Sequence, residues 1–185
     1  MKLSLKKSAL AVAILSATIN LAGAVDPDAW DTKPPEPTPT SKECADGEAW
    51  DAKSRKCVKL ESRIFDDLER FRAARELAYA GRFNAAAMAL DAMSDQNDTR
   101  VLTYRGFLAR KSGDWLAAQL FYDQALAVDP DNLPARSYLG MGLAEKGDFE
   151  AARIQLAEIR LRGGRETWPE RALLMTLRSG GAAFY

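Results

Sequence analysis

The 185-residue chain contains no histidine and has no excess of either charge. Histidine is the commonest general base and the commonest transition-metal ligand, so its absence removes the usual centre of hydrolytic and metal chemistry. The 26 basic and 26 acidic residues cancel, and nucleic-acid binders carry a basic surface that this balance does not favour. We therefore expect a protein that is not an enzyme, that holds no metal or cofactor and that does not bind nucleic acid.

Long apolar runs are also scarce, and the one that matters lies at the N-terminus. Three lysines among the first seven residues precede an apolar run over Ala9–Leu21, and small side chains follow at Ala22-Gly23-Ala24. A membrane anchor is the rival interpretation, but a span needs about 20 apolar residues and this run is shorter and interrupted by Asn20. The pattern predicts a secretory signal peptide over residues 1–24, cleaved before Val25. We expect an exported bacterial protein of the periplasm, soluble and without an integral membrane segment once the signal is removed.

Proline is concentrated in the segment that follows, which reads DPDAWDTKPPEPTPT from Asp26 to Thr40. Closely spaced prolines oppose a helix and favour an extended polyproline II spacer. A proline-rich ligand for another module is the functional alternative. The sequence predicts a linker over residues 25–43.

Cysteine occurs only twice, at Cys44 and Cys57. In an exported protein such a pair is expected to form a disulfide, which for a loop of this length stabilises the fold by about 3 kcal/mol. A redox-active pair is usually spaced as C-x-x-C, and two thiols alone cannot complete a tetrahedral metal site. We predict a structural disulfide that closes a small hairpin over residues 44–57, with Trp50 as its hydrophobic plug.

Beyond Leu60 the chain is rich in alanine, leucine, arginine and glutamate at helical spacing. Short breaks recur at Gly81-Arg82-Phe83, Gly113-Asp114-Trp115 and Gly147-Asp148-Phe149, which are 32 and 34 residues apart. An alanine pair and an amphipathic segment follow each break. Self-similarity at such a period is the signature of a helical repeat protein.

The middle unit, residues 99–132, resembles the tetratricopeptide repeat family. The residues that carry the likeness are the large, small, aromatic and proline positions of that pattern, namely Leu102, Gly106, Ala109, Ala118, Tyr122, Ala125 and Pro130. The units over about 67–98 and 133–166 are looser copies, and a helix over 168–178 would cap the stack before a tail over 179–185. The resemblance implies an all-α domain over residues 61–178, a right-handed superhelix of about three helix-turn-helix repeats with a C-terminal capping helix, preceded by the disulfide-closed hairpin.

Local signals explain how each unit would begin and end. Asp114 and Asp148 stand where a side-chain oxygen can cap the second helix of a hairpin, and Pro130 ends such a helix. The small residues of the pattern let the paired helices approach closely.

The resemblance also implies a concave groove, lined by the first helix of each repeat, that binds a peptide or helix. The positions that face the groove in the family combine cations with apolar anchors, which suits a protein or peptide partner with acidic groups. The alternative is that these cations belong to an ordinary solvated helix face and bind no partner. The candidate groove residues are Arg75, Tyr79, Arg100, Phe107, Arg110, Lys111, Met141 and Glu145.

The sequence thus predicts a periplasmic scaffold or adaptor that mediates protein–protein interaction through a concave, partly cationic groove. Three alternatives stay open: a cell-envelope assembly factor, a self-associating structural protein, and a non-catalytic subunit of an envelope enzyme. Incompletely capped repeat stacks can pair end to end, which is why self-association is among them.

Overall fold

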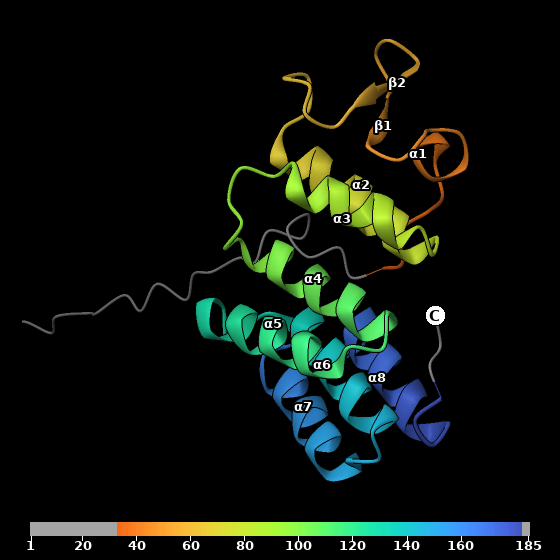
Figure 1. The fold of residues 1–185 in the computed structure, drawn as a ribbon. Helices are drawn as coiled ribbons and strands as arrows, with labels where there is room; N and C mark the ends of the chain where they lie inside the picture. The colour runs from red at the N-terminus through yellow and green to blue at the C-terminus, as the bar shows by residue number, and fades with distance from the viewer. Residues whose placement is uncertain (1–32, 183–185) are drawn as a thin grey trace, which may run out of the picture.

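The computed structural model describes residues 33–182, so the predicted signal peptide lies outside the described residues. The first part is a helical turn, α1 (Pro39–Lys42), and an antiparallel hairpin of β1 (Glu48–Asp51) and β2 (Lys56–Lys59). A disulfide joins Cys44 to Cys57, as predicted. The hairpin lies at one end of the molecule (Figure 1).

Seven longer helices make up the rest of the described chain. They form three consecutive helical hairpins, α2 with α3, α4 with α5 and α6 with α7, while α8 packs on α6 and α7. This arrangement confirms the predicted stack of helix-turn-helix repeats with a capping helix (Figure 1). Their bounds are α2 (Asp67–Tyr79), α3 (Phe83–Asp91), α4 (Thr99–Lys111), α5 (Trp115–Val128), α6 (Leu133–Glu145), α7 (Phe149–Leu161) and α8 (Trp168–Arg178).

The turn α1 forms inside the segment for which the prolines predicted an extended spacer. It is possible because Pro39 occupies the first helical turn, where no backbone N–H is needed. The carboxylate of Glu76 in α2 holds this turn in place: it accepts hydrogen bonds from the Thr38 backbone N–H at 2.7 Å, the Thr38 hydroxyl at 2.8 Å and the Ser41 N–H at 3.0 Å. Part of the predicted linker is therefore docked on the first repeat.

Helix ends in the stack follow the local signals of the sequence. The carboxylates of Asp114 and Asp148 each accept a hydrogen bond, at 3.0 Å, from the backbone N–H three residues further on. The turn glycine before them has a positive φ, 88° at Gly113 and 86° at Gly147, a conformation that side chains with a Cβ rarely adopt. Caps and turns of each hairpin are thus set by neighbouring residues.

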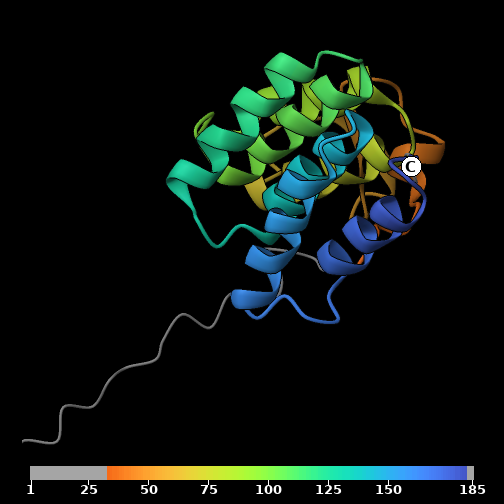
Figure 2. The ribbon, with the colours of Figure 1, turned by 90° about the horizontal axis from the view of Figure 1, so that it is seen from below.

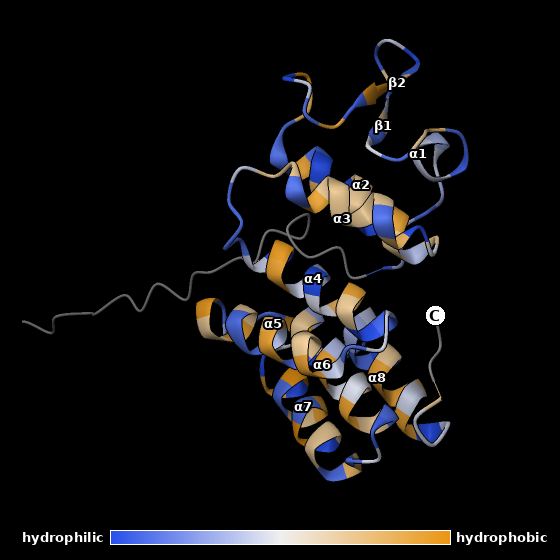
Figure 3. Cartoon of the chain, viewed as in Figure 1, coloured by the Kyte–Doolittle hydropathy of each residue, from blue (hydrophilic) through white to orange (hydrophobic). Residues whose placement is uncertain are grey.

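Packing between the two helices of the middle hairpin depends on a missing side chain. A Cβ placed on Gly106 of α4 would lie 2.5 Å from Cε1 of Tyr122, which is fully buried in α5. The glycine therefore lets the tyrosine ring lie directly on the backbone of α4. Hydrophobic and hydrophilic residues alternate along the helices of the stack (Figure 3), and a set of the apolar ones from α2 to α8 is buried.

No helix in the range 33–182 is both long enough and apolar enough to cross a membrane.

Candidate protein-binding surfaces

Aromatic side chains from the first helices of the repeats form a continuous row. Ring centroids lie 6.0 Å apart for Tyr79 and Phe107, which are stacked, and 5.2 Å apart for Phe107 and Tyr138. The indole N–H of Trp168 donates to the Tyr79 hydroxyl at 3.2 Å, across 89 positions of sequence. The row therefore links α2, α4, α6 and α8, so the first and last repeat units meet on this side. We call it the aromatic row: Phe71, Tyr79, Tyr104, Phe107, Tyr138 and Trp168.

Hydroxyl groups tie the row together. The hydroxyl of Tyr138 lies 3.0 Å from that of Tyr79 and 3.3 Å from that of Tyr104. Burial raises the pKa of Tyr104, and the neighbouring Tyr79 raises it further. The Tyr104 phenol is therefore a neutral hydrogen-bonding group at ordinary pH. The contacts among the three hydroxyl groups link the rings of α2, α4 and α6.

Two of the predicted groove cations, Arg75 and Arg110, lie beside this row and also bind other residues of the chain. Arg75 is buried and donates to the backbone carbonyl of Lys33, with its guanidinium 6.0 Å from the Tyr79 ring centroid. The Nη1 of Arg110 lies 2.5 Å from an Oε of Glu145, and its guanidinium lies 5.6 Å from the Phe107 ring centroid.

Lys111 is half-buried next to Arg110 at the C-terminal end of α4. Burial lowers the pKa of Lys111, and the charge of Arg110 lowers it further, while Glu145 acts in the opposite direction. The folded protein therefore disfavours the ammonium form, and an added carboxylate at this position would favour it.

The remaining predicted groove residues are placed differently. Arg100 lies at the N-terminal end of α4, where its Nη2 is 2.5 Å from an Oδ of Asp98 and its guanidinium is 5.3 Å from the Phe71 ring centroid. The hydrogen bonds that Arg100 donates to the Asp98 carboxylate raise the pKa of Arg100. Met141 is fully buried in α6. The structure thus gathers Tyr79, Phe107, Arg110, Lys111 and Glu145 in one region, puts Arg100 at the other end of α4 and places Met141 in the interior.

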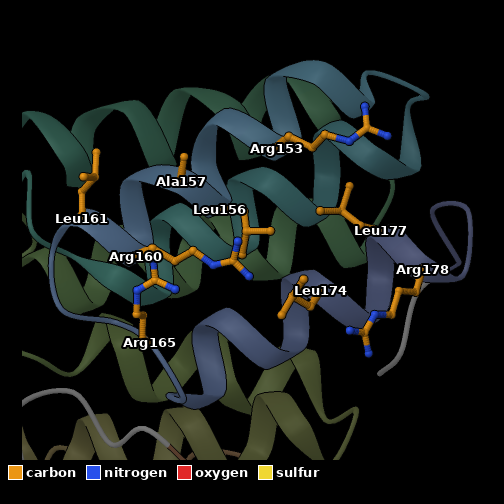
Figure 4. Close-up of a pocket in the computed structure, with 9 residues that line it drawn as sticks. All are labelled: Arg153, Leu156, Ala157, Arg160, Leu161, Arg165, Leu174, Leu177 and Arg178. Carbon is orange, nitrogen blue, oxygen red and sulfur yellow. The ribbon is translucent and has the colours of Figure 1, made fainter.

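A second surface lies between α7 and α8, which run side by side at the end of the stack nearest the viewer in Figure 2. It is a groove of about 610 Å³ with aliphatic side chains along its length and arginines around them (Figure 4). We call it the α7–α8 groove. Its lining residues are Arg153, Leu156, Ala157, Arg160, Leu161, Arg165, Leu174, Leu177 and Arg178.

One carboxylate just outside this lining organises the groove. Glu170, at the start of α8, accepts from Nε of Arg160 at 2.6 Å and from the backbone N–H of Glu166 at 2.7 Å. These two hydrogen bonds, with the bond from Arg160 as the larger cause, lower the pKa of Glu170. The bond from Arg160 holds α8 against α7, and the Glu170 carboxylate balances the charge of Arg160.

Sequence reasoning missed the α7–α8 groove because its lining comes from two helices with different roles in the repeat pattern. The available signal was the row of arginines at 153, 160, 165 and 178 interleaved with leucines. Which of these side chains share a face depends on how α8 crosses α7, and periodicity within one helix does not contain that angle.

Replacing Glu170 by glutamine should lower the free energy of unfolding at neutral pH by about 1 kcal/mol, because an amide accepts more weakly from Arg160 and from the backbone. The pKa of Glu170 is lower in the folded protein than its ordinary value of 4.5. Its contribution is therefore fully present above that value and is lost as the pH falls through the folded pKa. Urea unfolding over a pH series should show the gap between wild type and Glu170→Gln closing in acid.

The matched control is Glu150→Gln. Glu150 also pairs with an arginine of α7, Arg153 at 2.7 Å, but its side chain is 85% exposed. An exposed ion pair contributes little to the free energy of unfolding, so this variant should unfold like the wild type. If the difference in unfolding free energy between wild type and Glu170→Gln did not change with pH, the Glu170 carboxylate would not be the stabilising group.

Comparison with known families agrees with this geometry. Residues 109–174 match the family model described as Tetratricopeptide repeat, a stretch that runs from the end of α4 into α8. The search of curated proteins and the search of solved structures found no match. Proteins built from these repeats generally mediate protein–protein interaction through surfaces that stacked helical hairpins create. Together with the three stacked hairpins and the glycine-to-tyrosine contact of the middle one, this match over residues 109–174 supports a tetratricopeptide repeat protein.

Proposed function

We propose that this protein is a periplasmic adaptor that holds an acidic, partly apolar segment of a protein partner beside the aromatic row. The cations Arg75, Arg110 and Lys111 lie along this side of the first helices, next to Tyr79 and Phe107. Such a surface combines aromatic anchors with positive charge, the pairing that protein interfaces favour at their most important contacts.

The observation that carries the proposal is the environment of Lys111. Lys111 is half-buried at the C-terminal end of α4, where burial and the neighbouring charge of Arg110 lower its pKa. A carboxylate from a partner would raise the pKa of Lys111 in the same direction as Glu145 does, so an acidic segment at this position favours the ammonium form.

Export is part of the proposal and has separate support. The disulfide between Cys44 and Cys57 suits an oxidising compartment, and disulfides of this kind are rare in the cytosol. The predicted signal peptide over residues 1–24 is consistent with that location. An envelope assembly factor or a non-catalytic subunit of an envelope enzyme would use the same surface, and the partner's identity separates these roles.

Lys111→Gln should weaken capture of the partner by about fivefold, the effect of losing one partly exposed charge pair. It should not weaken the fold, since the charged form is disfavoured there. The full chain is produced with its N-terminal segment in a Gram-negative host, cross-linked in the envelope and recovered, and bound proteins are identified by mass spectrometry. N-terminal sequencing of the recovered chain should begin at Val25.

The control is Lys146→Gln, an exposed lysine at the end of α6. Wild type and Lys146→Gln should recover the same protein, cross-linked through an acidic segment, and Lys111→Gln should recover much less. Equal recovery by all three forms would disprove the role of the aromatic row. A chain that retains Met1 would disprove export with cleavage.

A further inference from the structure

We infer that the α7–α8 groove is a second docking site, which takes an acidic amphipathic helix from a partner protein in the place where the second helix of a fourth repeat would pack. This site is separate from the aromatic row and does not depend on the proposed function.

The repeat pattern defines the position that such a helix would occupy. The helix α8 begins with Trp168-Pro169 as α6 begins with Leu133-Pro134, so α8 corresponds to the first helix of a further repeat. In this alignment Leu174 of α8 corresponds to Leu139 of α6. Leu139 is buried in α6, which packs on α7, whereas Leu174 is only half-buried. The helix that would cover Leu174 is missing from the described chain.

The chain itself does not supply that helix within the described residues. After α8 it turns at Gly180 and Gly181, both with positive φ. Gly181 lies against the end of α6, where an added Cβ would be 2.5 Å from the carbonyl oxygen of Ala144. The backbone through Ala182 is therefore directed to α6 and leaves the groove open.

The size and lining of the groove suit one face of a helix. Its volume of about 610 Å³ is in the range of well-formed binding sites. Leu161 is 78% exposed, and Leu174 and Leu177 are half-buried on the opposite wall. Leucines spaced along two neighbouring helices form the kind of groove into which an amphipathic helix places its apolar positions.

Charge identifies the chemistry of the occupant. Four of the nine lining residues are arginines and none is a carboxylate. Arg153 pairs with Glu150 and Arg160 with Glu170. Within residues 33–182 no carboxylate lies at ion-pair distance from Arg165 or Arg178. A helix with glutamate or aspartate beside its leucines would complement this rim, and complementary charge confers specificity on an interface.

A second copy of the chain fits less well. Symmetric pairing of two α7–α8 grooves would bring the arginines of both copies together, and like charges in a contact are repulsive. A copy could instead offer its exposed leucines on α5, such as Leu116 and Leu120. That surface provides apolar contact without the acidic groups that the rim would need.

The test uses a fluorescein-labelled helical peptide of about 14 residues, roughly four turns, with leucines at every third or fourth position and glutamates between them. Fluorescence anisotropy measures its binding to the full chain. We expect binding by the wild type and about tenfold weaker binding by Arg165→Glu/Arg178→Glu, since two attractive contacts become repulsive. A peptide with lysine in place of glutamate should instead prefer the double variant.

The matched control is Arg171→Glu, which reverses an exposed charge on α8 outside the groove lining. It should bind the acidic peptide as the wild type does. Unchanged binding by the double variant, or an equal loss with Arg171→Glu, would overturn the site. If the wild type sediments as a dimer and the double variant as a monomer, the occupant of the groove is a second copy of the chain and not a partner helix. Because Lys111 lies outside the groove lining, Lys111→Gln should leave peptide binding intact, so the two proposals fail separately.

Discussion

Replacing Gly106 by valine should lower the free energy of unfolding by about 3 kcal/mol, the range of a strained, overpacked core site. The first atom of the new side chain would lie 2.5 Å from Cε1 and 2.7 Å from Cδ1 of Tyr122. The tyrosine is fully buried, so its ring cannot move aside without displacing α5. Denaturant unfolding of the purified variant measures the loss.

A double-mutant cycle identifies the cause of that loss. Tyr122→Ala alone should cost about 3–5 kcal/mol because it leaves a cavity. In the double variant the valine occupies part of that cavity, so the two losses should not add, and the coupling should exceed about 1 kcal/mol. The matched control is Ala127→Val, which introduces the same side chain at an exposed position of α5 and should change stability by less than about 0.5 kcal/mol. Strictly additive losses would show that the clash with Tyr122 does not cause the stability loss of Gly106→Val.

Replacing both Cys44 and Cys57 by serine should remove about 3 kcal/mol of stability from the β-hairpin, the amount that closing a loop of this size contributes. Two paired strands of four residues are not stable alone. Hydrogen exchange measured by mass spectrometry should show that amides of residues 44–60 lose protection. Amides of α4 to α8 should keep theirs, because within residues 33–182 the main contacts of the hairpin are with α1 and the first repeat.

Hydrogen bonds also hold the hairpin on the first repeat, in addition to the disulfide that closes it, and they could keep it folded in the double serine variant. Arg82, in the turn between α2 and α3, donates to the carbonyl oxygen of Cys44 at 2.8 Å and lies 2.5 Å from an Oδ of Asp46. The Thr40 hydroxyl accepts from the Trp50 N–H at 3.0 Å. Unchanged protection in the double serine variant would mean that these contacts suffice. Adding reductant to that variant is the control and should have no effect.

Several sequence predictions were confirmed because neighbouring residues decide them. A helix begins where Asp114 or Asp148 can cap it and a hairpin turns where Gly113 or Gly147 can adopt a positive φ, whatever the rest of the chain does. The disulfide also follows from two cysteines in one short loop. The expected extended linker was wrong over its last residues, since Glu76, more than 30 positions away, stabilises the turn α1.

The sequence by itself determined the repeats and their caps, because helical periodicity and short-range hydrogen bonds are local properties. It only predicted which residues would face the first-helix side. Only the tertiary structure decided how those residues are used. It pairs Arg110 with Glu145, brings Trp168 to Tyr79 across 89 positions and leaves Leu174 half-covered beside α7. These outcomes depend on the angles at which whole helices cross, and those angles result from the packing of all the hairpins together.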